Sequence, residues 1–189
     1  MKLILASASP RRKSLLEQVG LTFEVEPADI NERVLSGETP AAMTERLSKE
    51  KAAVVAAKHP EAVVLAADTS VVFEGEIIGK PKDPADARQT IRRLSGKTHE
   101  AVTGYTVAGG GRSVTKSVTS KVRFAELDDD VIERYVATGE PFDKAGGYGI
   151  QDRGVLLVDS IEGDYANVVG LPLRDVVDDL RNFGIVAIQ

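Results

Sequence analysis

The chain has 189 residues, a formal net charge of −5 and no cysteine. Disulfide scaffolds, cysteine-bound zinc and thiol catalysis are therefore excluded, and two histidines are too few for a histidine-rich metal site. The acidic balance argues against nucleic acid or a membrane surface as a partner, because either needs a dense basic patch. The length indicates one domain over residues 1–189. The apolar run at the N-terminus is too short for a signal peptide, so we expect a cytoplasmic protein.

The first half of the chain alternates between expected strands and helices. Strands are expected at residues 3–6, 21–25 and 62–67, and residues 29–38 form a polar loop. Helices are expected to begin at Ser9-Pro10 and Thr39-Pro40, because a hydroxyl residue followed by proline is typical of a helix start. The run at 62–67 is continuously apolar, as in a strand covered on both faces, and we expect it to stop at Asp68.

The second half is richer in hairpins. We expect a hairpin over residues 71–78, a helix from Asp83-Pro84, a hairpin formed by 102–107 and 114–124, a helix capped by Asp128, a glycine-rich loop at 143–149, a strand at 155–158 and a helix at 172–183. Helices and strands do not alternate strictly. The pattern therefore predicts an α/β fold with a mixed, twisted sheet, flanking helices and two lobes.

The loop at residues 7–12 is the most informative candidate site. It joins a strand to a helix N-terminus, where free backbone N–H groups and the helix dipole favour phosphate. Ser7, Arg11 and Arg12 add donors, and arginine suits phosphate oxygens. Arg12 precedes Leu15 and Leu16 by three and four residues, so it lies above the core face of the helix. The alternative is an exposed, capped turn with solvated arginines.

Lys51 and Asp68 are the next candidates. The helical phase places Lys51 on the buried face of its helix, from which it either extends to the surface or enters an internal polar site. Asp68 follows the apolar strand, where ligands bind in open α/β sheets. Its carboxylate can hold a divalent ion or accept a proton, and the alternative is a turn aspartate.

Other candidates carry weaker local signals. Lys80 lies between glycine and proline, and an exposed turn residue is the plainer interpretation. Asp143 and Lys144 open the glycine-rich loop, which matches no nucleotide-binding signature. The amide of Gln151, just after that loop, offers a donor and an acceptor to a base edge. Glu32 lies in the polar loop without a distinguishing neighbour.

Taken in order, these segments resemble the Maf family of nucleoside triphosphate pyrophosphatases. The matching segments span nearly the whole chain and are specific in combination: residues 7–12, 47–52, 66–69, 79–81, 143–151, 163–165 and 167–172. The resemblance implies an elongated α/β fold shared with inosine triphosphate pyrophosphatases, the Maf/Ham1-like fold, with a cleft between two lobes. It also implies a homodimer that hydrolyses a nucleoside triphosphate to the monophosphate and pyrophosphate.

The resemblance further implies roles for individual residues. Asp68 is the expected proton acceptor, and the triphosphate site is expected to contain Ser7, Arg12, Glu32, Lys51 and Lys80. The implied cofactor is Mg²⁺, with Mn²⁺ or Co²⁺ as alternatives. Oxygen ligands from Glu32 and Asp68 suit such an ion, and metal binding and base catalysis by Asp68 are not separable from sequence.

The family divides according to the base. Arg11, Thr69 and Gln151 match the branch that acts on dTTP and UTP, and Asp143 and Lys144 are further candidates for substrate binding. A 7-methyl-GTP pyrophosphatase is an alternative. Another is a non-enzymatic nucleotide-binding regulator of cell division or septum formation, which would retain the phosphate site without needing a general base.

Overall fold

The computed structural model describes residues 1–187, which divide into two compact units. Unit 1 comprises Met1–Thr69, Thr103–Val118 and the chain from Gly170 onward. Unit 2 comprises Ser70–Val102 and Thr119–Val169. None of the described helices is long and apolar enough to cross a membrane.

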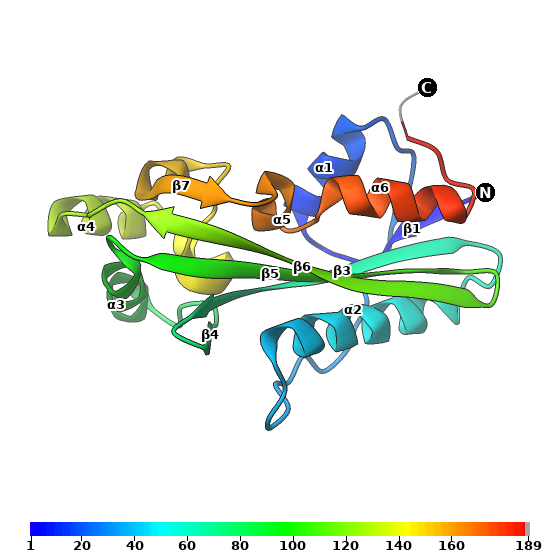
Figure 1. Cartoon of the computed structure of the whole chain (residues 1–189), viewed down its shortest axis with the longest axis horizontal. Coiled ribbons are helices and arrows are strands. Elements are labelled where there is room, and N and C mark those ends of the chain that lie inside the picture. The colour runs from blue at the N-terminus through cyan, green and yellow to red at the C-terminus, as the bar shows by residue number, and fades with distance from the viewer. Residues whose placement is uncertain (188–189) are drawn as a thin grey trace. The chain divides into compact units, whose positions relative to one another are not determined.

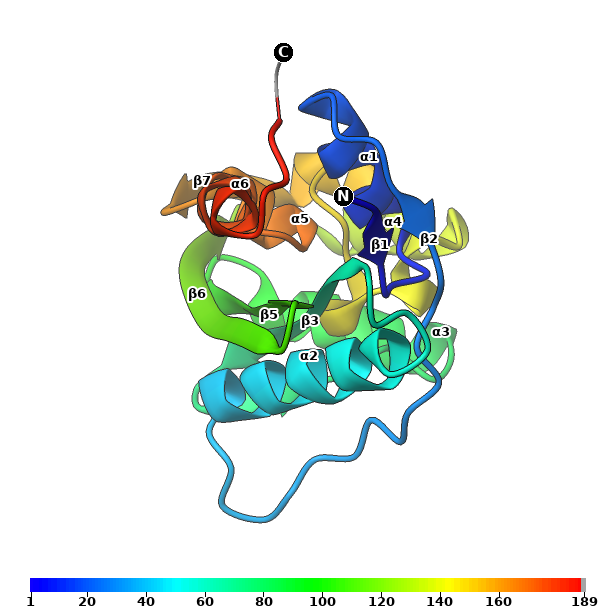
Figure 2. The ribbon, with the colours of Figure 1, turned by 90° about the vertical axis from the view of Figure 1, so that its right-hand side faces the viewer.

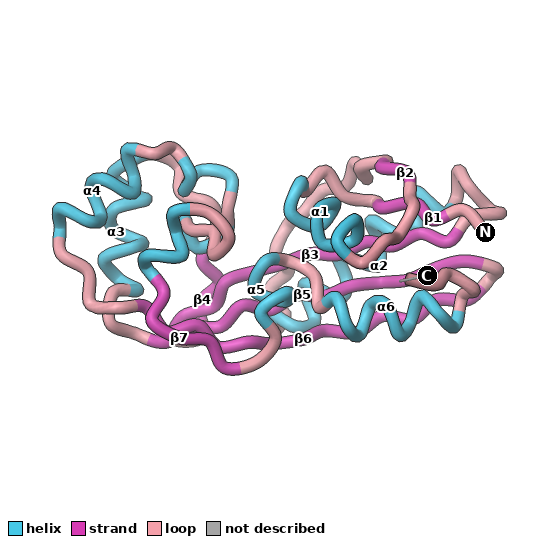
Figure 3. Tube along the Cα trace, turned by 90° about the horizontal axis from the view of Figure 1, so that it is seen from above, coloured by secondary structure: helices cyan, strands magenta, loops and turns pink. Residues whose placement is uncertain are grey.

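A mixed sheet runs through the described chain in the order β2-β1-β3-β5-β6-β7, with β4 also paired to β3. Its strands are β1 (Leu3–Leu5), β2 (Glu24–Val25), β3 (Val63–Phe73), β4 (Glu76–Ile78), β5 (Thr98–Gly109), β6 (Arg112–Phe124) and β7 (Val158–Glu162). β1 is parallel to β2 and β3, whereas β4 and β7 are antiparallel to their partners. Figure 3 marks the strands in magenta. The predicted mixed α/β fold is confirmed.

Unit 1 contains the helices α1 (Pro10–Gln18), α2 (Pro40–Ala56) and α6 (Leu173–Asn182). Within this unit, α2 and α6 cover opposite faces of the strands (Figures 1 and 2). The predicted helix starts are confirmed, because Ser9 and Thr39 accept hydrogen bonds from the backbone N–H groups of Arg12 and Ala42. Gly104 on β5 lets α2 approach closely: a Cβ there would lie 2.3 Å from the carbonyl carbon of Thr44.

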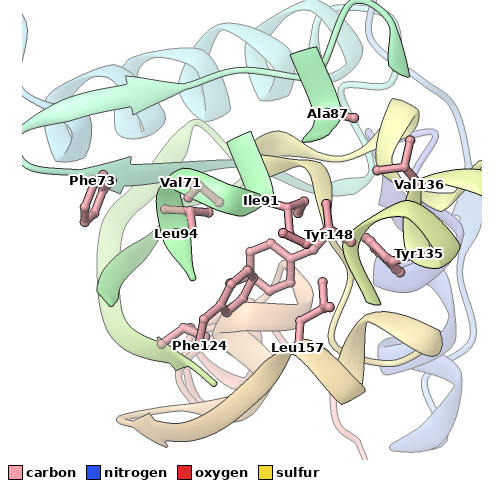
Figure 4. Close-up of a cluster of buried hydrophobic side chains, with 12 residues drawn as sticks. Val71, Phe73, Ala87, Ile91, Leu94, Phe124, Tyr135, Val136, Tyr148 and Leu157 are labelled. Carbon is pink, nitrogen blue, oxygen red and sulfur yellow. The ribbon is translucent and has the colours of Figure 1, made fainter. Parts of the chain in front are cut away.

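Unit 2 contains α3 (Pro84–Leu94), α4 (Asp129–Ala137) and the short α5 (Tyr165–Val169), with 3-10 turns at Glu140–Asp143, Ala145–Gly147 and Arg153–Leu157. Its core joins α3 and α4 to strand residues and to the glycine-rich loop. Phe124 and Tyr148 meet edge to face at the centre of this core, with Ile91 and Leu94 of α3 beside them (Figure 4). The glycine-rich loop is therefore anchored to the core of unit 2 by its tyrosine.

Several predicted boundaries are wrong. The expected strand at 155–158 begins only at Val158, because the preceding apolar residues form a 3-10 turn. The expected strand at 21–25 is reduced to Glu24–Val25, and α5 was not expected. Asp128 is the N-cap residue of α4 as expected, although its side chain makes no capping hydrogen bond.

The largest correction concerns Asp68. β3 does not stop there but continues to Phe73, so Asp68 lies within the strand. β3 pairs with β1 as far as Leu65 and with β4 from Val71. Asp68 thus lies in the stretch of β3 between these two partners. A carboxylate is tolerated inside the strand because its charge is paired there.

Candidate active site

The loop between β1 and α1 is ordered by its own hydroxyl groups. Ser7 is buried at the end of β1, and its Oγ accepts a hydrogen bond from the backbone N–H of Ser9 at 3.2 Å. Ser9 caps α1, and Pro10 occupies the first helical turn. The loop therefore presents the N-terminus of a nine-residue helix, whose positive end favours an anion.

Arg12 ties this loop to two distant segments of unit 1. Its Nε donates to the backbone carbonyl of Gly170 at 2.8 Å, and its Nη1 donates to the carbonyl of Ala67 at 2.8 Å and to Ser7 Oγ at 3.1 Å. Its Nη2 donates to Thr69 Oγ1 at 3.0 Å. This fork joins the loop, β3 and the segment before α6, as only a planar guanidinium can.

The environment of Arg12 acts on its protonation in two directions. Burial lowers the pKa of the guanidinium from its ordinary value, and the nearby Asp68 carboxylate opposes that effect. Arginine nevertheless stays protonated at any physiological pH. The phase argument that placed Arg12 above the core is confirmed, whereas Lys13 on the other side of α1 is exposed and pairs with Glu17.

Lys51 brings together the two acidic candidates. Its Nζ lies 2.7 Å from Asp68 Oδ1 and 2.8 Å from Glu32 Oε1. Lys51 is only 7% exposed, so the alternative in which it extends to the surface is wrong. Because Lys51 comes from α2, Asp68 from β3 and Glu32 from a loop, three separate segments of unit 1 converge on one ammonium group.

Thr69, beside Asp68, joins the guanidinium of Arg12 to Thr103. Its Oγ1 accepts from Arg12 and lies 2.9 Å from Thr103 Oγ1. Arg11 is half-buried on α1.

The remaining candidates belong to unit 2. Lys144 is buried, and its Nζ contacts Asp143 Oδ1 at 2.6 Å and the carbonyl of Glu140 at 2.8 Å. A Cβ on Gly149 would lie 2.5 Å from Lys144 Cε, so the glycine leaves room for this side chain. Lys80 and Gln151 are exposed. The structure thus brings Asp143 and Lys144 together within unit 2.

Several supporting groups escaped sequence reasoning. The carbonyls of Ala67 and Gly170 are backbone atoms, which leave no trace in residue type. Arg46 of α2 binds both carboxylate oxygens of Glu38 at 2.7 and 2.8 Å and also donates to the carbonyl of Arg33. It therefore fastens the loop that carries Glu32. Only its further contact with Glu50, one helical turn later, has a readable spacing.

The chemistry of the acidic pair limits how a metal could be held. Among residues 1–187, no group of three or more histidine, cysteine, aspartate or glutamate side chains could form a metal site. Glu32 and Asp68 nevertheless supply two carboxylates around one point, where both touch Lys51 Nζ. Mg²⁺ is commonly bound by one or two carboxylates together with substrate phosphates, and the pair fits that arrangement.

The chain is similar to characterised families along its length. The model of the Maf-like protein family matches residues 2–183. A protein named dTTP/UTP pyrophosphatase from Moorella thermoacetica is 53% identical over 187 residues, covering 97% of this chain and 96% of the relative. A protein of the same name from Geotalea uraniireducens is 51% identical over 186 residues, with 97% and 96% covered.

A solved structure supports the fold. The HAM1 protein from Coxiella burnetii superimposes with a TM-score of 0.52 over 96% of this chain and 99% of its own, at 12% sequence identity. The expected likeness to the Ham1 fold is confirmed. With the family model and the sequence relatives in agreement along nearly the whole chain, the protein belongs to the Maf-like family.

Proposed function

We propose that the protein hydrolyses dTTP and UTP to the nucleoside monophosphate and pyrophosphate. The names of relatives about half identical to this chain support that substrate class. The observation that carries the proposal is the contact of Lys51 with Asp68 and Glu32, in the same unit as the helix N-terminus that begins at Ser9. Cations, a helix N-terminus and two carboxylates are the groups that triphosphate hydrolysis needs.

The reaction adds one water to the nucleotide. The water oxygen forms a bond to the α-phosphorus, the bond to the bridging oxygen breaks, and pyrophosphate leaves. Asp68 is the proposed proton acceptor for that water, because it is the buried carboxylate of the pair. Lys51 and Lys80, with Ser7 and the α1 N-terminus, bind phosphate oxygens in this proposal, and Arg12 adds positive charge and holds the loop.

A divalent ion completes the proposed site. Glu32 and Asp68 would hold Mg²⁺, or Mn²⁺ or Co²⁺ in its place, through carboxylate oxygens. When bound, such an ion neutralises charge on the phosphate oxygens. This chain's own residues hold the nucleotide, receive the proton and position the loop.

Arg11, Thr69 and Gln151 select the base in this proposal. Asp143 and Lys144, at the glycine-rich loop, are further substrate-binding residues. The amide of Gln151 is exposed and can satisfy the carbonyl and imide N–H of thymine or uracil together. Action as a homodimer, a cytoplasmic location and the absence of nucleic-acid and membrane partners stay predictions from the sequence.

The test is pyrophosphate release by the purified full-length protein with Mg²⁺. We expect dTTP and UTP to be hydrolysed, and CTP, ATP, GTP and 7-methyl-GTP to be at least about tenfold poorer in kcat/KM, because a buried polar group left unpaired costs roughly 1–3 kcal/mol. Tight nucleotide binding without pyrophosphate release would instead indicate a non-enzymatic regulator. If 7-methyl-GTP were the best substrate, the assignment of the base would be wrong.

A further inference from the structure

Lys51 occupies the space that a metal ion would need. Its ammonium lies 2.7 Å from Asp68 Oδ1 and 2.8 Å from Glu32 Oε1, with its side chain only 9% exposed. Both of these oxygens contact the one ammonium group. A divalent ion bound to both would lie at about 2.0–2.1 Å from each, within the contact radius of the ammonium.

The two cations therefore compete for one pair of ligands. Like charges at such separations repel strongly, especially where burial reduces solvent screening. The trio of Lys51, Glu32 and Asp68 carries a net charge of about −1 with the lysine in place, and −2 without it. The same carboxylates therefore attract a divalent ion far more strongly once the ammonium has left them.

We propose that Lys51 is an internal counter-ion that blocks metal binding until a triphosphate arrives. In the free protein it neutralises Glu32 and Asp68. When a triphosphate binds, its oxygens offer the ammonium new acceptors, Lys51 turns to them, and the carboxylates become available to the ion. The inference rests on the proposed function, since it takes the metal and triphosphate as the occupants of this site.

The two carboxylates that contact Lys51 differ in a way that suits this exchange. Asp68 is fixed within β3 and its side chain is 12% exposed, whereas the Glu32 side chain is 54% exposed on a loop without regular structure. The contact of Lys51 with Glu32 is accordingly the easier of the two to break, because exposed ion pairs contribute little to stability. Arg46 keeps the base of the loop in place through Glu38, so Glu32 stays near Asp68 after Lys51 leaves.

Binding of metal and nucleotide must then be mutually reinforcing. If the nucleotide removes Lys51 from the carboxylates, it raises metal affinity, and by linkage the metal raises nucleotide affinity by the same factor. A protein with an open pair of carboxylates would instead bind metal readily by itself. Metal binding that requires the nucleotide can thus be distinguished from metal binding that precedes it, although both lead to the same final complex.

The experiment measures Mn²⁺ binding to the full chain without nucleotide, by the electron paramagnetic resonance signal of free Mn²⁺. We expect weak binding to the wild type, and binding at least about tenfold tighter to Lys51→Gln, in line with typical coupling between sites. Lys51→Arg keeps the charge, so Mn²⁺ binding to this variant should stay weak. Lys49→Gln removes the same charge from an exposed position of α2 and should match the wild type. Equal or weaker binding to folded Lys51→Gln would overturn the proposal.

A second measurement needs no variant, in case Lys51→Gln does not fold. The side-chain ¹⁵N signal of the Lys51 ammonium is followed in the wild type. Mg²⁺ alone should leave it unchanged, and Mg²⁺ with a non-hydrolysable methylene analogue of dTTP should shift it. Saturable displacement by Mg²⁺ alone would overturn the proposal. Absence of analogue binding would refute the proposed function instead, while the response of the Lys51 signal to Mg²⁺ alone still decides the role of the lysine.

Discussion

Two buried lysines, one in each unit, are held in different ways. Lys51 reaches carboxylates on two other segments of the chain, β3 and the loop at 31–38. Lys144 contacts its neighbour Asp143 and the carbonyl of Glu140, four residues earlier. Long-range contacts bring chemical groups together, whereas local contacts fix the shape of a loop. We therefore expect substitutions around Lys51 to act on turnover and those around Lys144 to act on binding and stability.

The aspartates that pair with the two lysines give the largest expected contrast. Asp68→Asn should lower kcat by at least about 10²-fold, a typical contribution of a general base, without a large loss of stability. Asp143→Asn should raise KM and leave kcat within about tenfold, because its side chain is 62% exposed and its contact with Lys144 is between neighbours in the chain. Steady-state kinetics of both variants with dTTP check the contrast. Near wild-type turnover of folded Asp68→Asn would remove this carboxylate from the mechanism.

Substitutions at two glycines compare how rigid the atoms around each glycine are. Gly104→Ala should reduce the free energy of unfolding by about 3 kcal/mol, because its Cβ would meet the Thr44 backbone of α2 at 2.3 Å. Gly149→Ala should cost about 1 kcal/mol, because its Cβ would meet the long side chain of Lys144, which can move. Urea unfolding of the two variants checks the order. A larger loss for Gly149→Ala would show that Lys144 is held as firmly as a helix backbone.

His99, in the core of unit 2, makes the free energy of unfolding depend on pH. Burial lowers its pKa to about 4, while its Nε2 lies 2.7 Å from the hydroxyl of Tyr148 in the glycine-rich loop. The folded state therefore binds fewer protons than the unfolded state, whose histidine titrates near 6.5. The free energy of unfolding is therefore highest above about pH 6.5 and falls by about 3 kcal/mol as the pH decreases towards 4.

Urea unfolding between pH 4.5 and 7.5 measures this dependence. In His99→Gln the amide retains a partner for Tyr148 but does not titrate, so the slope with pH should flatten. An unchanged slope would assign the pH dependence to other groups.

Gln151 offers the sharpest test of specificity. Gln151→Ala should narrow the preference for dTTP over CTP by roughly 5- to 150-fold, the equivalent of one unpaired polar group. Affinity for inorganic tripolyphosphate, which has no base, should stay the same. Parallel kinetics and tripolyphosphate inhibition provide the measurement. Equal loss for all nucleotides would place Gln151 outside base recognition.

Sequence patterns located Lys51 and Arg12 correctly because helical phase is local. They failed at Asp68, where a charged residue suggested the end of β3, since the ion pair that permits it depends on distant residues. They also misplaced β7, because Val155 and Leu156 are apolar yet exposed in a 3-10 turn. The backbone acceptors of Arg12 could not be found from side-chain identities at all.

The fork of Arg12 has a consequence for protein synthesis. Arg12 leaves the ribosome 158 residues before Gly170, whose carbonyl receives its Nε. A nascent chain therefore cannot complete this set of hydrogen bonds until Gly170 has emerged. Premature termination before Gly170 would leave the arginine without that acceptor, so incomplete products should lack the assembled loop. The loop before α1 is thus completed only by the segment between α5 and α6.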